Sequence, residues 1–199
     1  MIPISLIIDD CFPNFDSFDL CDGFIIPGGS SIDKTIYYLI DYALRNNKPV
    51  LGICLGAQAI ANYSLIREKM DLRKRYTLEE IINIYESVKK ENEGRLIKPI
   101  PKSIVRNHTN YNSIARHFIS IDEDSIAYKI FKKKTMKVSS FHKYQFINIG
   151  KDFRVTGKST DGVNEIIEHE KEPLIIGVQF HPELMDKTIF DYFIDQLYN

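Results

Sequence analysis

The stretch KPVLGICLGAQAIA, residues 48–61, is the part of the sequence that decides the fold. An apolar run ends at Cys54, which lies between Gly52 and Gly56, and an alanine-rich stretch follows. The pattern G-x-C-x-G is typical of a turn from a strand into a helix that presents a nucleophile, because glycine permits a tight turn and close packing. A helix that begins here directs its N–H groups toward the sulfur, which predicts a lowered thiol pKa. The alternative is a buried structural cysteine with coincidental glycines.

The segments around this stretch alternate between strand and helix. Short apolar runs at 4–8, 23–27 and 49–53 are bounded by turn residues, which predicts buried parallel strands. Residues 33–46 lie between the last two runs and place apolar side chains at helical spacing. A strand, a helix and a second strand of this length form a βαβ unit, so we predict an α/β fold with helices on the faces of a sheet.

The second half of the chain is predicted to be rich in strands. Apolar runs occur at 117–121, 135–140, 153–159, 164–169 and 174–180, and residues 188–198 have the spacing of a last helix. Before them, a charged stretch at about 64–93 interrupts the pattern. It contains a predicted amphipathic helix that begins with Thr77 and Glu80 as a capping box and ends at Gly94.

The apolar face of this helix needs a cover. It consists of Leu78, Ile81, Ile82, Tyr85 and Val88. We expect the helix either to cover the active site near Cys54 or to pack against another subunit, because such a stripe left in water is unusually large for a monomer. The alternative is an extra outer helix that packs within the chain.

The bulk composition narrows the class of protein. A chain of 199 residues with 44% hydrophobic and 27% charged residues is predicted to form one domain, 1–199, with a helical insertion at about 64–93. The net charge of −1 gives no electrostatic case for binding nucleic acid or an anionic membrane. No membrane helix or signal peptide is evident, and the three cysteines show no disulfide spacing. We therefore expect a cytoplasmic protein in which Cys54 is a free thiol.

A nucleophilic thiol needs a base, and His181 is the best candidate. In GVQFHPE, residues 177–183, an apolar run delivers His181, and Glu183 follows two residues later. A carboxylate at this spacing suits a triad in which it holds the second ring nitrogen. The alternative is a surface turn after a strand.

The remaining histidines lack an acid at that spacing, and we expect them to be surface or hydrogen-bonded structural residues. They are His108, His117, His142 and His169. No Cys/His cluster has zinc spacing, and the dinucleotide fingerprint G-x-G-x-x-G is absent, so we expect no metal and no cofactor.

The third motif is DGFIIPGGSS, residues 22–31. A diglycine at the end of a strand leaves backbone N–H groups free to face a ligand. Together with the N–H of Leu55, one of them could form an oxyanion hole for a tetrahedral intermediate. A simple turn is the alternative.

The ordered motifs PGG, KPVLGICLGAQ and GVQFHPE resemble those of class I glutamine amidotransferase domains. Within that superfamily the chain is most similar to the gamma-glutamyl-gamma-aminobutyrate hydrolase family, the C26 group of cysteine peptidases. The segments VSSFHKYQF at 138–146, STDGVNEIIEH at 159–169 and LIIGVQFHPE at 174–183 support this similarity. The resemblance implies a three-layer, flavodoxin-like fold with a mostly parallel central sheet.

The resemblance also implies residue roles. Cys54 is expected to be the nucleophile, His181 the general base and then acid, and Glu183 the carboxylate that orients the imidazole. The backbone of Gly29 and Leu55 is expected to form the oxyanion hole. The residues expected to hold the glutamyl group are Gly28, Gln58, Ser140, Phe141 and His142.

The chain departs from the family pattern in three places. Relatives usually have another strand and helix before the strand that 4–8 matches, and they lack the insertion at 64–93. The usual His-His-Gln is here His142-Lys143-Tyr144. The first two departures concern the pocket rim and the oligomeric surface, and the third concerns the identity of the substrate.

We therefore expect a hydrolase that cleaves the gamma-glutamyl amide bond of a small compound through a thioester on Cys54. The first alternative is a glutaminase subunit that delivers ammonia to a partner synthase, because it uses the same triad. The second is a non-catalytic relative, which the intact triad argues against. Expected partners are a small gamma-glutamyl substrate or glutamine, and a second copy of the chain or a synthase. The amine that leaves, the pathway and the oligomeric state do not follow from the sequence.

Overall fold

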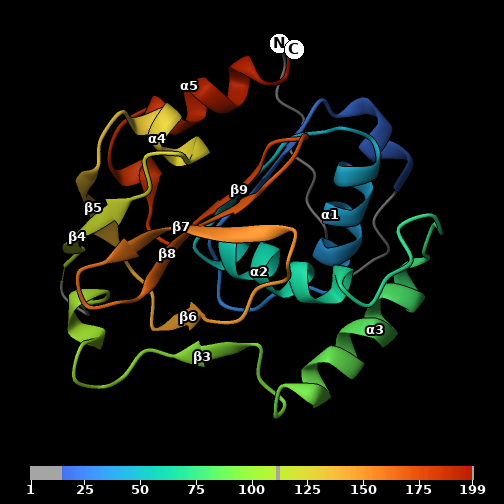
Figure 1. The fold of residues 1–199 in the computed structure, drawn as a ribbon, viewed down its shortest axis with the longest axis horizontal. Helices are drawn as coiled ribbons and strands as arrows, with labels where there is room; N and C mark the ends of the chain where they lie inside the picture. The colour runs from blue at the N-terminus through green and yellow to red at the C-terminus, as the bar shows by residue number, and fades with distance from the viewer. Residues whose placement is uncertain (1–14, 111–112, 199) are drawn as a thin grey trace.

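The computed structural model describes residues 15–110 and 113–198 (Figure 1). The strand expected at 4–8 and Cys11 lie outside these residues. The helices are α1 (Thr35–Arg45), α2 (Leu55–Arg67), α3 (Leu78–Glu91), α4 (Ile126–Phe131) and α5 (Thr188–Asp195). The strands are β1 (Phe24–Ile26), β2 (Val50–Ile53), β3 (Ile97–Pro99), β4 (Ala115–Ile121), β5 (Thr135–Ser140), β6 (Tyr144–Phe146), β7 (Phe153–Ser159), β8 (Asn164–His169) and β9 (Ile175–Val178). Three 3-10 helices complete the order: η1 (Phe15–Leu20), η2 (Val105–Asn107) and η3 (Pro182–Leu184).

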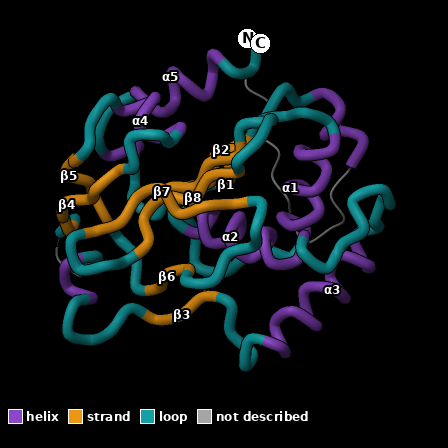
Figure 2. The backbone as a smooth tube through the Cα atoms, viewed as in Figure 1, coloured by secondary structure: helices purple, strands orange, loops and turns teal. Residues whose placement is uncertain are grey.

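Seven of the described strands form one sheet in the order β1-β2-β9-β8-β7-β4-β5. β1, β2 and β9 pair in parallel, and each later neighbour pairs antiparallel. Following these pairings, β1, β2, β9, β7 and β5 run in one direction, whereas β8 and β4 run in the other. The predicted α/β class with a mostly parallel sheet is therefore confirmed. The antiparallel part includes β7 and β8, which are joined by a short turn. β3 and β6 form a separate antiparallel pair beside α2 (Figure 2).

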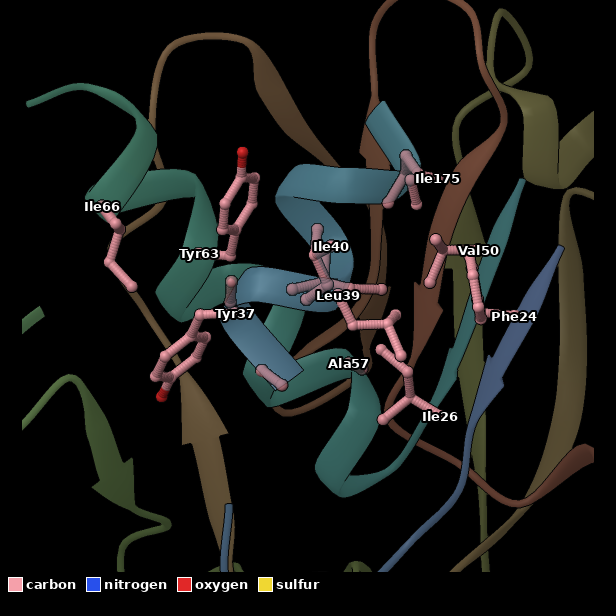
Figure 3. Close-up of a cluster of buried hydrophobic side chains, with 14 of the residues drawn as sticks. Phe24, Ile26, Tyr37, Leu39, Ile40, Val50, Ala57, Tyr63, Ile66 and Ile175 are labelled. Carbon is pink, nitrogen blue, oxygen red and sulfur yellow. The ribbon is translucent and has the colours of Figure 1, made fainter. Parts of the chain in front are cut away.

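Helices cover both faces of the sheet, which gives three layers. Successive residues of a strand point to opposite faces, so Val50 packs in a cluster with α1 and α2, whereas Leu51 packs in a cluster with α4 and α5. Figure 3 shows the first cluster, in which Tyr37 and Ile40 of α1 lie near Ala57 of α2. The strands next to Cys54 are apolar at nearly every position because both of their faces are buried. No helix within the described ranges has the length and apolar character needed to cross a membrane.

The helix expected within 64–93 is α3, and its capping box is confirmed. The Thr77 side chain accepts the Glu80 N–H at 3.2 Å, and a Glu80 carboxylate oxygen accepts the Thr77 N–H at 2.9 Å. Ile81 and Val88 are buried, and α3 packs on α1 and α2. The Tyr85 ring lies 4.9 Å from the Tyr37 ring, measured between centroids.

The apolar face of α3 is therefore covered within the chain, as the alternative interpretation held. The contact also explains why α2 is buried on nearly all sides, since the sheet lies on one side of it and α1 and α3 lie on others. We expected a cover for the active site or a subunit contact. Ile81 and Val88 are buried within the chain, whereas the partly buried Tyr85 also borders a hollow next to Leu55, at the start of α2.

Replacing Ile81 tests this packing. Ile81→Ala removes a side chain with 0% exposure and should lower the free energy of unfolding by about 2–4 kcal/mol, because a cavity remains between α3 and α2. Chemical denaturation followed by circular dichroism measures the change. Ile82→Ala, on the half-buried side of the same helix, is the matched control and should cost less than half as much. A change in oligomeric mass with unaltered stability would instead assign the α3 face to a subunit contact.

Candidate active site

Cys54 lies at the turn between β2 and α2. Its backbone has φ 51° and ψ −99°, outside the regions that L-residues prefer, and its N–H donates to the Val178 carbonyl of β9 at 2.8 Å. Gly56 makes the turn possible, because a Cβ at this position would lie 2.3 Å from the Ile26 carbonyl oxygen of β1. The sequence pattern G-x-C-x-G thus corresponds to a close approach of α2 to the sheet, with Cys54 presented at the carboxyl ends of the parallel strands.

His181 and Glu183 lie at the end of the β9 segment, beside Cys54. The backbone N–H of His181 donates to the Ser139 carbonyl of β5 at 2.8 Å, which fixes the backbone position of His181. His181 Nδ1 lies 2.7 Å from a carboxylate oxygen of Glu183. Because a carboxylate accepts, Nδ1 carries the proton and Nε2 presents a lone pair. Nε2 is buried and forms no hydrogen bond with any described residue.

Gly28 shows how closely His181 and Cys54 approach one another. A Cβ on Gly28 would lie 3.1 Å from His181 Cε1 and 3.5 Å from Cys54 Cβ. The imidazole and the thiol therefore border the same small volume. Glycine at this position leaves it open, and the structure brings together the three residues of the expected triad.

The pKa of the Cys54 thiol is raised, contrary to the expectation of a lowered pKa. Burial is the main cause and raises the Cys54 pKa to about 11. A hydrogen bond from the Leu55 N–H lowers the Cys54 pKa, whereas the negative charges of Glu183 and Glu165 raise it further. The effect of the helix start is present, but burial of the sulfur and two nearby carboxylates outweigh it.

Gln179 is a further residue near the sulfur, and sequence reasoning did not single it out. Its side-chain Nε2 lies 3.8 Å from Cys54 Sγ and donates to the Cys54 carbonyl at 3.4 Å. The Gln58 amide donates to the Gln179 side-chain oxygen at 3.2 Å. Gln179 lies in the GVQFHPE motif, so the motif contained the signal, but its role there was not considered.

Some of the residues expected to form the oxyanion hole and to bind substrate lie together near the start of α2. Gly29 and Leu55 are neighbours, since a Cβ on Gly29 would lie 3.0 Å from a Leu55 methyl carbon. Leu55 and Gln58 border a hollow of about 410 Å³. Its other walls come from the loop after β1, from Asn62 of α2, from Tyr144 and from the insertion, which contributes Tyr85, Lys89 and the segment 94–97.

The side chains of residues 140–142, which were expected to hold the glutamyl group, lie in different surroundings. Phe141 is half exposed, Ser140 is buried, and the His142 ring is buried against Glu165 instead of the hollow. His108, His117 and His169 are buried as well. None of the three is a surface residue, and His108 Nδ1 and His117 Nε2 have no hydrogen-bond partner among the described residues. His108, His117 and His142 gather around Glu165, a grouping that the sequence spacing did not indicate.

Comparisons with known proteins agree with this geometry. The peptidase C26 family matches residues 30–183, which is more than half of the chain. A glutamine amidotransferase-like protein of Rickettsia prowazekii is 28% identical over 87% of this chain and 74% of its own length. The CTP synthase of Microcystis aeruginosa is 28% identical over 83% of this chain, which spans only 31% of that enzyme.

Among solved structures, the glutaminase domain of CTPS from Trypanosoma brucei has a TM-score of 0.65. It is 18% identical, with 92% of this chain and 73% of that chain covered, so the likeness concerns the fold alone. The extent of the family match is decisive. The chain belongs to the peptidase C26 family and has the class I glutamine amidotransferase fold.

Proposed function

We propose that the protein is a cysteine-dependent hydrolase that cleaves the gamma-glutamyl amide bond of a small compound. The observation that carries this proposal is the arrangement around Gly28. The Cys54 thiol and the His181 ring border one volume there, and Glu183 holds His181 Nδ1 at 2.7 Å. Membership of the peptidase C26 family supports hydrolysis of a C–N bond.

The reaction follows from the protonation states. His181 Nε2 takes the thiol proton as Cys54 Sγ attacks the amide carbon, and a C–S bond forms. The tetrahedral intermediate collapses when the C–N bond breaks, and the imidazolium protonates the leaving amine. Water then attacks the thioester, with His181 again as base, and the free carboxylate leaves as the thiol is restored. Glu183 orients the imidazole and stabilises its positive charge.

Two backbone N–H groups are suited to the developing negative charge. Leu55 N–H is the first amide of α2, and Gly29 lies beside it at the end of the β1 loop. Backbone donors at a helix start stabilise an oxyanion without reorganising during the reaction. Gln179 touches the sulfur and Gln58 touches Gln179, so this amide pair helps to position the nucleophile.

The hollow beside Leu55 is suited to an acidic substrate. Lys89 and Arg95 contribute positive charge to its walls, and Gln58, Asn62, Ser30 and Ser31 contribute hydrogen-bonding groups. A gamma-glutamyl compound carries a carboxylate and an amino group at the end away from the scissile bond. These walls can therefore bind a carboxylate of the glutamyl group or of the leaving amine.

The second candidate is a glutaminase whose ammonia passes to a synthase. The likeness to CTP synthase sequences, with the chain spanning about a third of each, favours it specifically. Both candidates use the same thioester chemistry. They differ in whether the leaving group is an organic amine or ammonia, and in whether turnover requires a partner.

Release of glutamate from a panel of gamma-glutamyl amines and from free glutamine tests the proposal. We expect the isolated protein to hydrolyse at least one amine faster than glutamine. Cys54→Ser should lower that rate by about 10³-fold or more while the protein stays folded, because a hydroxyl is a far weaker nucleophile than a thiol here. Cys21→Ser, at the other described free cysteine, is the matched control and should leave the rate unchanged. Turnover of glutamine alone, and only with an added synthase, would establish the second candidate. Full activity in Cys54→Ser would exclude both.

Substitution of the other two triad residues separates proton transfer from orientation. His181→Ala removes the base, whereas Glu183→Gln keeps a hydrogen-bonding group beside Nδ1. We therefore expect Glu183→Gln to lose roughly one to two orders of magnitude less activity than His181→Ala. Steady-state kinetics on the best substrate measures both values. Equal losses in folded proteins would show that Glu183 does more than orient the imidazole.

The raised Cys54 pKa predicts a specific pH dependence. A thiol with a pKa of about 11 is protonated near neutral pH, and only the thiolate reacts with iodoacetamide. The alkylation rate at Cys54, followed by mass spectrometry of its peptide, should therefore rise steadily between about pH 7 and pH 10 without a plateau. A plateau below about pH 8 would mean that the resting sulfur is already ionised, as in a thiolate–imidazolium pair.

A further inference from the structure

A buried cluster of three histidines and one glutamate lies behind the active site. Glu165 belongs to β8 and His117 to β4, whereas His108 follows η2 and His142 follows β5. Exposure is 0% for Glu165 and His108, 4% for His142 and 7% for His117. Within one edge of the fold, where β4, β5, β7 and β8 lie together (Figure 1), four segments thus direct titratable side chains to one point.

The inward atoms of the cluster are close together. One carboxylate oxygen of Glu165 lies 3.2 Å from His108 Nδ1, 3.1 Å from His117 Nε2 and 3.5 Å from His142 Nε2. The ligand atoms of His108, His117 and Glu165 all lie within 4.8 Å of one another. Despite this proximity, none of these four inward-facing groups forms a well-directed hydrogen bond with any described residue.

The outward ring nitrogens are each held by an acceptor. His117 Nδ1 lies 3.1 Å from the Asn107 carbonyl, and His142 Nδ1 lies 3.0 Å from the Tyr144 carbonyl. His108 Nε2 lies 3.1 Å from a carboxylate oxygen of Asp161. The same Asp161 carboxylate accepts hydrogen bonds from the Asn107 amide and the Ser159 hydroxyl, so it acts as an acceptor in this network.

These partners determine where the protons are. A carbonyl or a carboxylate requires an N–H donor, so each outward nitrogen carries a proton. When the imidazoles are neutral, each inward nitrogen presents a lone pair, and all three lone pairs face the carboxylate of Glu165. Four acceptors directed at one another without a donor in a buried site are unfavourable, and a positive charge at their centre removes this conflict.

We propose that His108, His117 and Glu165 bind a zinc ion and that His142, 3.5 Å from Glu165, moves inward as the fourth ligand. With zinc–ligand bonds of about 2.0–2.1 Å, two ligand atoms of a tetrahedral site lie roughly 3.3 Å apart. The distances from Glu165 to His108 Nδ1 and His117 Nε2, 3.2 and 3.1 Å, are close to this value, whereas His142 Nε2 lies 3.5 Å from Glu165 and outside the group of ligand atoms within 4.8 Å of one another. Neutral imidazole suits a first-row transition metal, and Asp161 and the two carbonyls provide the outer contacts that orient histidine ligands.

The site is structural, because four protein ligands fill a tetrahedral shell and none of them reaches solvent. It connects η2, β4, β8 and the segment after β5, which includes Tyr144 at the wall of the hollow. The Glu165 carbonyl also accepts the Gln179 N–H at 2.8 Å, and the Gln179 side chain touches Cys54. The ion thereby supports the wall of the active site without touching substrate, and this role does not depend on which substrate is cleaved.

Metal titration of the untagged full-length protein tests the proposal. After removal of metal with a chelator, Co²⁺ is the optical probe and Zn²⁺ the competitor. We expect one Co²⁺ per chain with the intense visible bands of tetrahedral cobalt, and loss of these bands when Zn²⁺ is added. Zinc at a free concentration 100-fold above its dissociation constant should raise the melting temperature by about 5–10 °C.

Variants locate the ion. Glu165→Gln keeps the shape of the side chain and should weaken zinc binding by at least about 100-fold, whereas Asp161→Asn, one shell further out, should weaken it by about 10–100-fold. His169→Gln is the matched control, because His169 is buried on the same strand as Glu165 and outside the cluster. Cys54→Ser is the second control, and both controls should bind zinc like the unmodified protein.

Several outcomes overturn the proposal. A folded protein that binds no tetrahedral cobalt contradicts it, and in that case the cluster is held by protons alone. Loss of binding in Cys54→Ser places the ion at the active-site thiol instead. If Glu165→Gln does not fold, the Asp161→Asn titration decides, since unchanged zinc affinity in that folded variant also contradicts the site.

Discussion

The geometry of the candidate active site depends on the close approach of α2 to β1. A Cβ on Gly56 would lie 2.3 Å from the Ile26 carbonyl oxygen, so only glycine allows α2 to begin directly at the end of β2. This early start places Cys54 at φ 51° and ψ −99°, a conformation that costs on the order of 1–3 kcal/mol. The parallel pairing of β1, β2 and β9 supports it, and the Cys54 N–H bonded to Val178 anchors it.

The same approach explains the chemistry of the thiol. A sulfur held between the sheet, Gln179 and the start of α2 is almost fully buried, and burial disfavours its charged form. A protonated, buried thiol is a poor target for oxidants, because the thiolate is the reactive species. The proposed mechanism fits this state, since His181 removes the proton during attack and no stable thiolate has to exist beforehand. In this mechanism the N–H groups at the start of α2 stabilise the negative charge of the oxyanion more than that of the sulfur.

The fold could be predicted because its signals are local. Buried strands with two covered faces form continuous apolar runs, and α1, α3 and α5 show helical spacing, so their positions followed from the sequence. β3 and β6 were missed because their three residues include charged or polar side chains and form no continuous apolar run, in contrast to those of β1, and α4 has too few turns. The cover of α3 could not be predicted, because the amphipathic pattern of a helix defines its apolar face but not the surface opposite it. Here that surface is α2, whose own sequence is apolar on nearly all sides.

The functional residues also divide into those that the sequence reveals and those that only the fold brings together. Cys54 with its glycines, and His181 with Glu183, each lie within a few residues of one another, so the chemistry is visible in short motifs. The histidine–glutamate cluster is assembled from four segments between residues 108 and 165. Zinc sites with a sequence signature take pairs of ligands from one turn or helix, whereas here each ligand comes from a different segment and no two lie at metal-binding spacing. The turn between β7 and β8 brings Asp161 to His108, and the register of β4 against β7 brings His117 toward Glu165. Tertiary pairing therefore creates this cluster. Its chemistry becomes apparent only from the direction of each ring, because the outward hydrogen bonds leave three inward nitrogens facing one carboxylate.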